Sequence, residues 1–254
     1  EMKIGIVTSF NKRLYEYYAH RFLKSYNWPF DLLIYHEGWV PEDFTVRDNI
    51  YYRNIHDGKV GEKLKKFQAR AGEFNIDSVE KGRPDKIIHG TNYKKDAVRF
   101  SYKVFAKCDA MLAPRHPYDY MFWIDADVIF KKNITAKEVV DKFLPGDYAI
   151  SFIHRPTYYS ECGFVGYNLR HPDTRLFVNK FEDYYSSLKI FKEKEWHDSY
   201  IFDVVRKKIL YNTPQFNLSP KIRRVGNPWP DTPMAEYMDH LKGKARKDAG
   251  EMLP

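Results

Sequence analysis

Cysteine is scarce in this chain. Its 254 residues include only two, Cys108 and Cys162. Two thiols cannot build a framework of several disulfides, and they do not match the spacing of a zinc site made of cysteines. We therefore expect a protein of a reducing compartment, the cytoplasm, or the host cytoplasm if the chain is viral.

Long apolar runs are also missing. No run approaches the roughly 20 residues that a helix needs to cross a bilayer, and the residues after Met2 do not resemble a secretory signal. These absences predict a soluble protein without a transmembrane segment. Hydrophobic residues make up 43% and aromatic residues 17% of the chain, which is enough for a large core and for an aromatic-lined ligand cleft.

Acidic residues are the minority among the charged ones. The 42 Lys and Arg against 34 Asp and Glu leave a net charge of +8. Such an excess favours an anionic partner: nucleic acid, an anionic membrane face or a phosphorylated substrate. Basic residues are dense at 59–70 and in the tail at 242–247. A solvated helix face explains the first of these equally well.

The N-terminal third alternates between strand and helix patterns. Strands are predicted at residues 3–10, 31–38 and 50–55, and a helix at 12–26. This order indicates an α/β fold with a mixed, mostly parallel central sheet flanked by helices, in one domain over 1–254. Ligands of such sheets bind beyond the carboxyl ends of the strands. That rule places Thr8, Ser9 and Phe10, with Arg13 in the next helix, near a site.

The rest of the chain continues the alternation. Further helices are predicted at 59–75, 92–110, 135–143, 173–188 and 195–208, and further strands at 120–129, 147–153 and 162–169. Thr135 and Glu138 match a capping box at the start of one helix. Residues 82–85 read as a loop, residues 209–220 as irregular with short strand pieces, and the chain from Lys221 as loop.

The stretch FWIDADVIF (122–130) places Asp125 and Asp127 within a predicted strand. Residues two apart on a strand lie on the same side of it. Two carboxylates at a strand end can hold Mg²⁺ or Mn²⁺, which accept carboxylate and phosphate oxygens together. In the alternative, the strand ends at Ile124 and the aspartates cap a turn. The apolar residues on both sides favour the strand.

Taken with its context, the Asp-x-Asp motif resembles that of the GT-A class of nucleotide-sugar glycosyltransferases. The segment KKDAVRFSYK (94–103) looks like the helix that approaches the nucleotide in that class, which implies donor contacts by Asp96, Arg99 and Lys103. Arg99 and Lys103 lie four apart on one helix face and can meet one polyanion. A solvated face, or ion pairs with Asp96 and Asp109, explains the two residues equally well.

Two later segments extend the resemblance. ECGFVGYNL (161–169) looks like the strand in which a glycine, here Gly163, lets the donor sugar approach the backbone. HLKGKARK (240–247) resembles the His-x-x-Gly-x-x-Lys element of glycogenin-like and galactosyltransferase-like members. The resemblance implies His240 as third metal ligand and Gly243 as the turn before a basic phosphate contact. Arg246 stands where the Lys is expected, so Lys244, Arg246 and Lys247 all stay candidates for that contact.

The segment EWHDSYIFD (195–203) contains the first candidate for a catalytic carboxylate. The resemblance places such a group near the start of a helix in the second half, which points to Asp198, with Glu161 as the second candidate. An inverting enzyme would use it as general base, and a retaining enzyme would use it to orient the donor. Asp198 also fits a plain helix N-terminal residue favoured by the helix dipole.

These features together predict a metal-dependent glycosyltransferase. The donor is a nucleoside-diphosphate sugar, with a UDP-sugar expected, bound by the half at 1–130, and the half at 131–254 contributes to the donor sugar and acceptor. A hydroxymethylated pyrimidine in phage-like DNA is one predicted acceptor, reached by base flipping. A cell-surface polysaccharide or lipid-linked glycan is the other, with the basic tail contacting anionic lipid. A nucleotidyltransferase and a non-catalytic nucleic-acid-binding module are the remaining alternatives.

Overall fold

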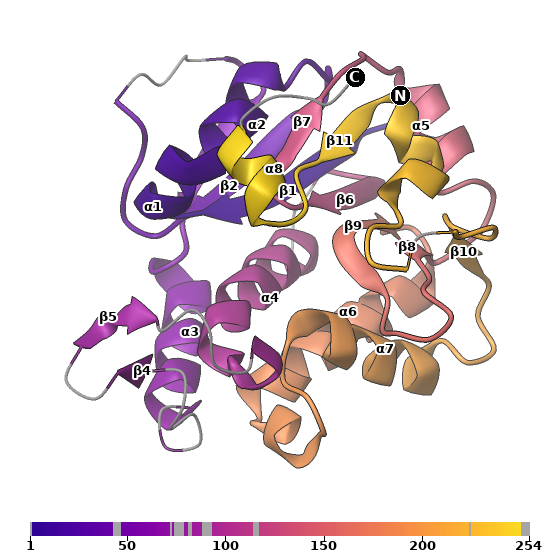
Figure 1. The fold of residues 1–254 in the computed structure, drawn as a ribbon. Helices are drawn as coiled ribbons and strands as arrows, with labels where there is room; N and C mark the ends of the chain where they lie inside the picture. Colours follow the sequence, from indigo (N-terminus) through magenta and orange to yellow (C-terminus); the bar gives the residue numbers. More distant parts are fainter. Residues whose placement is uncertain are drawn as a thin grey trace.

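The protein is built around a sheet of seven strands. A computed structural model describes residues 2–42, 47–71, 73, 79–80, 83–87, 93–113, 117–223 and 225–249. The strand order is β10-β8-β9-β6-β1-β2-β3 (Figure 1). The strands are β1 Ile4–Phe10, β2 Asp31–His36, β3 Ile50–Asn54, β6 Tyr120–Ile124, β8 Ile150–Ile153, β9 Glu161–Asn168 and β10 Gln215–Asn217. Four neighbouring pairs are parallel, and the two pairs that involve β9 are antiparallel. The predicted mixed, mostly parallel α/β fold is confirmed.

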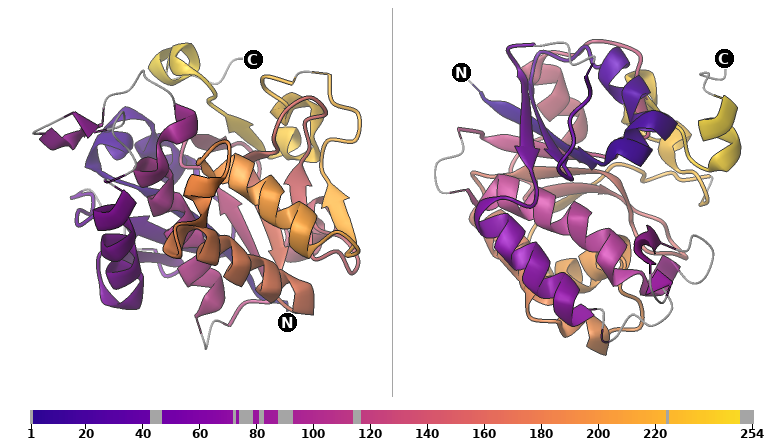
Figure 2. Two further views of the ribbon diagram at one scale, coloured as in Figure 1. Left: turned by 90° about the horizontal axis from the view of Figure 1, so that it is seen from below. Right: turned by 90° about the vertical axis from the view of Figure 1, so that its left-hand side faces the viewer.

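Helices cover both faces of this sheet. One face carries α3 Gly58–Ala71, α4 Ala97–Leu112, α6 Pro172–Ser186 and α7 Asp198–Ile209 (Figure 2). The opposite face carries α2 His20–Ser25 and α5 Ala136–Phe143, together with the segment near residues 229–240. In β1, Ile4 and Ile6 face the core under α2 and α5, and Val7 faces the core under α4. Because both faces are covered, the central strands read as nearly continuous apolar runs.

Several predicted elements differ in detail. The predicted helix at 12–26 consists of α1 Lys12–Leu14, a π-helical turn at Tyr15–Ala19, and α2. The predicted helix at 92–110 is a short 3₁₀ turn at Tyr93–Lys95 followed by α4, and Asn92 lies outside the described residues. The capping box of Thr135 and Glu138 at the start of α5 is confirmed.

Two segments predicted as loop contain regular structure. Residues 82–85 fall largely within β5 Arg83–Ile87, which pairs with β4 Val79–Glu80. The chain after Lys221 contains 3₁₀ turns at Trp229–Asp231 and Pro233–Glu236, the strand β11 Met238–His240 and the short helix α8 Lys244–Ala249. Local propensity missed β11 because its partner, β7 Val128–Phe130, is more than a hundred residues away.

Candidate metal and donor site

The Asp-x-Asp motif lies in a turn, so the prediction of one strand over 120–129 was wrong. β6 ends at Ile124, and the backbone N–H of Val128 donates to the carbonyl of Asp125 at 3.2 Å. After the turn, β7 leaves the main sheet and pairs antiparallel with β11. The turn still places both aspartates at the carboxyl end of a central strand, where ligands of α/β sheets bind.

The pairing of β7 with β11 brings His240 to this turn. His240 lies opposite Val128 in the register, and the N–H of Leu241 donates to the carbonyl of Asp127 at 2.9 Å. Asp125, Asp127 and His240 each offer one ligand atom, and these atoms lie within 4.8 Å of one another. The structure therefore brings together the three residues predicted as metal ligands.

The donor set fits a divalent cation. Asp127 Oδ1 and His240 Nε2 are 3.1 Å apart in residues that are 9% and 4% exposed. Asp127 Oδ1 is buried, and the His240 ring is the partner that it has among the described residues, so a cation between the two would take the place of that contact. Two carboxylates and an imidazole form a mixed oxygen–nitrogen set that suits Mn²⁺ and accommodates Mg²⁺.

Electrostatics favour the charged form of each member of this buried pair. Burial by itself would raise the pKa of Asp127, but His240 and Lys247 outweigh it and hold that pKa below its ordinary value. Burial by itself would lower the pKa of His240, and the Asp127 carboxylate outweighs that effect and raises it. A cation that binds this imidazole must displace its proton, because metals take the neutral ring.

Gly163 supplies space beside the cluster. A Cβ at this position would lie 3.3 Å from Glu161 Oε1, 3.3 Å from His240 Cε1 and 3.4 Å from Asp125 Oδ2. The N–H of Asp125 also donates to the carbonyl of Gly163 at 2.9 Å. The predicted glycine thus lies against all three residues, and any larger side chain would project among them.

Lys103, on α4, links the Asp-x-Asp turn to α7. Its Nζ lies 2.7 Å from Asp125 Oδ1 and 3.0 Å from Asp198 Oδ2, and it also donates to the carbonyl of Cys162 at 2.9 Å. Lys103 pairs with these two carboxylates and not with Asp96 or Asp109, the ion-pair partners expected in one alternative, and its contact with the donor stays a prediction. Asp96 is instead the N-cap of α4, accepting from the N–H of Arg99, whose side chain is exposed.

Asp198 and Glu161 are both buried ion-pair partners. Burial would raise the pKa of Asp198, but Lys103 and Lys107 outweigh it and lower that pKa. Burial would likewise raise the pKa of Glu161, but Lys242 and His240 outweigh it. Asp198 is also the first residue of α7, capped by His197, so its helix-terminal role is real as well.

Two lysines of the basic tail contact acidic residues of the site. Lys247 Nζ lies 2.6 Å from Asp127 Oδ2, and Lys242 pairs with Glu161. Arg246 donates to the carbonyl of His240 at 2.8 Å and so braces the metal-ligand strand. Gly243 turns the chain into α8 with a φ of +88°, a conformation that glycine adopts without strain. The side chain of Lys244 lies outside the described residues.

The carboxyl end of β1 borders the same region. Thr8 and Phe10 are buried, Ser9 is half-buried, and Asn11 rather than Ser9 caps the next helix. Tyr18, in the π-helical turn, interacts with charges of the cluster and of this end of the sheet. Burial and the carboxylates of Asp127 and Asp125 raise the pKa of its hydroxyl, and Arg99 and Arg13 act in the opposite direction. Lys247 Nζ lies 4.6 Å from the centre of the Tyr18 ring. Tyr18 thus links the cluster to Arg13, while the position of Thr8, Ser9 and Phe10 relative to a nucleotide stays a prediction.

Three supporting residues were missed by the sequence reasoning. Trp123 donates from Nε1 to Asp125 Oδ1 at 2.7 Å. Lys107 is 1% exposed, and its Nζ lies 3.8 Å from Asp198 Oδ2. Its position one helical turn after Lys103 was an available signal. Lys242 was treated only as part of the basic tail, and its contact with Glu161 depends on tertiary structure.

A pocket of about 530 Å³ opens beside the metal cluster. Glu161, Asp198 and Lys242 line it together with the aromatic side chains of Tyr93, Tyr158 and His197. A volume in this range is typical of small-molecule sites. The carboxylates on this wall are those that contact Lys103 and Lys242, so the pocket and the metal cluster share one network of charges.

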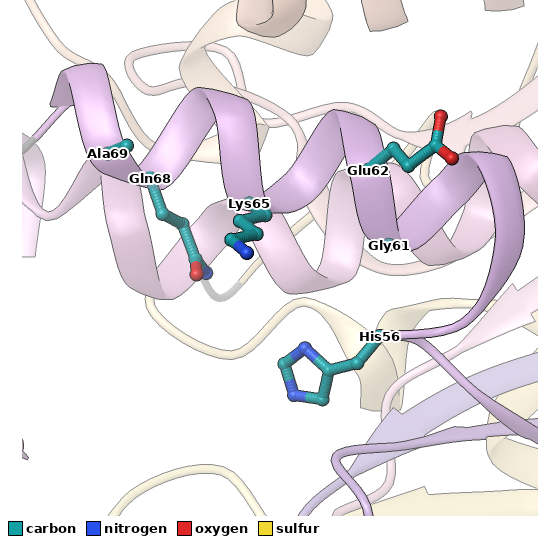
Figure 3. A pocket seen from close by; sticks show the side chains of 6 residues that line it. All are labelled: His56, Gly61, Glu62, Lys65, Gln68 and Ala69. Atoms are coloured by element: carbon teal, nitrogen blue, oxygen red, sulfur yellow. The ribbon is translucent and has the colours of Figure 1, made fainter.

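A second pocket, of about 430 Å³, runs along α3. Lys65 and Gln68 point toward His56 across it, and Glu62 points away (Figure 3). It is lined by α3 and by His56, and it includes no residue of the Asp125, Asp127 and His240 cluster. The first pocket differs in that its lining includes Glu161 and Asp198, whose partners Lys242 and Lys103 belong to the charge network around the cluster.

The sheet and the helices on its two faces form the GT-A fold, which solved glycosyltransferases share. A galactosyltransferase, LgtC, solved with donor and acceptor sugar analogues, matches with a TM-score of 0.52 and 14% identity, over 95% of this chain and 88% of that one. Mouse xyloside xylosyltransferase 1 in its apo form matches with a TM-score of 0.50 and 11% identity, over 92% of both chains. At these identities the likeness concerns the fold.

The comparisons of sequence, unlike those of structure, found no match. No protein-family model matches the chain, and no curated protein matches it.

Of the helices in the described ranges, none combines the length and apolar character that a membrane span requires.

Proposed function

We propose that this protein is a metal-dependent glycosyltransferase that moves a sugar from a nucleoside-diphosphate donor to an acceptor hydroxyl. The observation that carries the proposal is the convergence of Asp125, Asp127 and His240 at the carboxyl end of β6, within a GT-A fold. In the reaction, the acceptor oxygen bonds to the anomeric carbon while the bond from that carbon to the diphosphate oxygen breaks. The electron pair leaves with the diphosphate, which also takes up the hydroxyl proton.

Each residue of the cluster receives a role. Asp127 and His240 would hold the cation directly, and Asp125 would hold it through a water or contact the donor ribose. The cation, Mn²⁺ or Mg²⁺, supplies Lewis-acid stabilisation of the charge on the leaving diphosphate. Ser9, Arg13 and Arg99 would contact the nucleotide, for which a UDP-sugar remains the expected donor. Thr8 and Phe10 are buried and would contribute only to the strand that carries Ser9.

Asp198 suits orientation of the donor sugar better than proton abstraction. A general base works best with a pKa near the operating pH. The pKa of Asp198 is held low against burial by Lys103 and Lys107, and that of Glu161 by Lys242 and His240. Both carboxylates therefore favour hydrogen bonding to sugar hydroxyls from fixed positions, with Gly163 leaving room for the ring.

A donor screen tests the proposal before any acceptor is known. The protein is incubated with UDP-, GDP-, ADP- and TDP-sugars, with Mn²⁺ or with EDTA, and hydrolysis is followed by mass spectrometry. We expect slow release of one nucleoside diphosphate with Mn²⁺, reduced at least tenfold by EDTA. Hydrolysis of no donor, or hydrolysis that EDTA leaves unchanged, would count against a metal-dependent transferase.

Lys247 is the predicted phosphate contact among the three tail candidates. Its ammonium lies 2.6 Å from Asp127, whereas Arg246 binds the backbone of His240. We expect Lys247→Ala to raise the donor KM about tenfold, because a hydrogen bond to a charged group is lost. Lys66→Ala, an exposed lysine of α3, is the matched control and should leave KM within twofold. Equal donor KM values in the two variants would show that Lys247 does not contact the donor phosphates.

A further inference from the structure

Four aromatic residues from distant parts of the chain line the 530 Å³ pocket. Tyr93 precedes α4, Tyr158 and Tyr159 lie between β8 and β9, and His197 caps α7. The rings of Tyr158 and Tyr159 are 4.3 Å apart, and those of Tyr159 and His197 are 4.4 Å apart. The Tyr93 hydroxyl lies 3.3 Å from that of Tyr158 and also contacts that of Tyr159. We call these four residues the aromatic rim.

Two tyrosines of the rim are exposed, and contacts with their neighbours hold them in place. Tyr93 and Tyr158 are 45% and 46% exposed, so their rings are accessible to a ligand. Arg155 lies behind them, with its guanidinium 4.8 Å from the Tyr158 ring and its Nε donating to the Tyr159 carbonyl at 2.7 Å. Because the rings are fixed before a ligand arrives, binding on them costs little conformational entropy.

The charged groups that line the pocket already have partners. Arg155 lies 3.7 Å from Glu161, Lys242 pairs with Glu161, and Asp198 pairs with Lys103. Among the described residues that line the pocket, the two cations Arg155 and Lys242 are matched by the two carboxylates Glu161 and Asp198, so the lining has no surplus of positive charge for a chain of phosphates. The hydroxyls, carboxylates and imidazole there are groups that exchange hydrogen bonds with a neutral, hydroxyl-rich ligand.

We propose that the aromatic rim binds a saccharide as the acceptor, which rests on the proposed transferase function. A pyranose ring has one face made largely of C–H bonds, and the electron-rich face of an aromatic ring attracts such positively polarised edges. With a sugar ring on Tyr158, its hydroxyls face Glu161 and Asp198 at the wall shared with the metal cluster. A saccharide is therefore proposed in place of a pyrimidine in DNA. DNA would need cations that contact its phosphate backbone as well as rings that stack on its bases.

The test uses the donor from the hydrolysis screen with a panel of p-nitrophenyl glycosides and a duplex that contains 5-hydroxymethylcytosine. We expect transfer to at least one glycoside and none to the duplex. Tyr158→Ala should raise the glycoside KM about tenfold, whereas Tyr158→Phe, which keeps the ring, should stay within threefold. Tyr211→Ala, at a residue 75% exposed outside the pocket, is the control and should match the unaltered protein.

The outcomes test the saccharide inference separately from the proposed transferase function. Donor hydrolysis without transfer to any glycoside, or transfer to the duplex alone, overturns the saccharide inference and leaves the proposed function standing. If no donor is hydrolysed, the proposed function fails, and saturation-transfer NMR with the same glycosides decides the inference separately. A glycoside signal that Tyr158→Ala abolishes supports a saccharide site, and its absence from the unaltered protein overturns it.

Discussion

Asp127→Asn should lower the metal-dependent rate of donor hydrolysis by about 10³-fold, because the cation's contribution to the leaving diphosphate is worth several kcal/mol. The amide keeps the size of the carboxylate but removes its charge. It also leaves His240 and Lys247 without the anion that both contact, at 3.1 Å and 2.6 Å. Calorimetric titration with Mn²⁺ should show binding to the unaltered protein and at least a hundredfold weaker binding to the variant.

The control for this substitution is Asp141→Asn. Asp141 is an exposed residue of α5 that pairs with Lys137, and its substitution should change neither rate nor affinity beyond twofold. Circular dichroism of both variants checks that the fold is kept. An Asp127→Asn protein with unchanged Mn²⁺ affinity would show that the Asp125, Asp127 and His240 cluster does not hold the metal.

Lys103→Met should lower the free energy of unfolding by about 3 kcal/mol, the cost of leaving buried charges without their partner. Lys103 is the cation that contacts both Asp125 and Asp198, and the side chain of Asp198 is only 3% exposed. The loss stays near the lower end of the range for buried pairs because Lys107 remains 3.8 Å from Asp198 and Trp123 still donates to Asp125. Urea unfolding followed by fluorescence measures it.

A double-mutant cycle shows whether the loss comes from the pair itself. Lys103→Met with Asp198→Asn removes both charges, so the double variant should be more stable than the sum of the two single losses predicts, by about 1–2 kcal/mol. Lys103→Arg keeps the charge and should recover most of the stability. Strict additivity of the single substitutions would show that Lys103 and Asp198 do not stabilise each other.

The sequence predicted the class of fold because each local signal agrees with the global one. The strands β1, β2 and β3 and the helices between and after them follow apolar periodicity, and a sheet covered on both faces leaves long apolar runs. Where the prediction failed, the deciding contact was distant: β6 ends at Ile124 because β7 pairs with β11 instead of continuing in the main sheet. Alternation along a strand contains no information on that partner.

The candidate site shows the same division. Asp125, Asp127 and His240 were found by motif, and the structure brings their ligand atoms within 4.8 Å. Lys247 could not be chosen over Lys244 and Arg246 from the sequence, since only the turn at Gly243 and the packing of α8 on the π-helical turn decide which cation reaches Asp127. Lys103 and Lys107 of α4 are one helical turn apart, but their shared partner, Asp198 of α7, follows them in the chain by 95 and 91 positions.

The sequence by itself determined the residue types of this protein: the carboxylate pair, the histidine, the glycine beside them and a surplus of cations. It also determined the alternation of strands and helices, because each strand or helix depends on the pattern of residues within a few positions. Only the tertiary structure decided that these groups meet, that Asp198 and Glu161 are neutralised by lysines, and that Tyr93 and Tyr158 lie at one pocket. Contacts between residues far apart in the chain depend on how the layers pack, which no local pattern specifies.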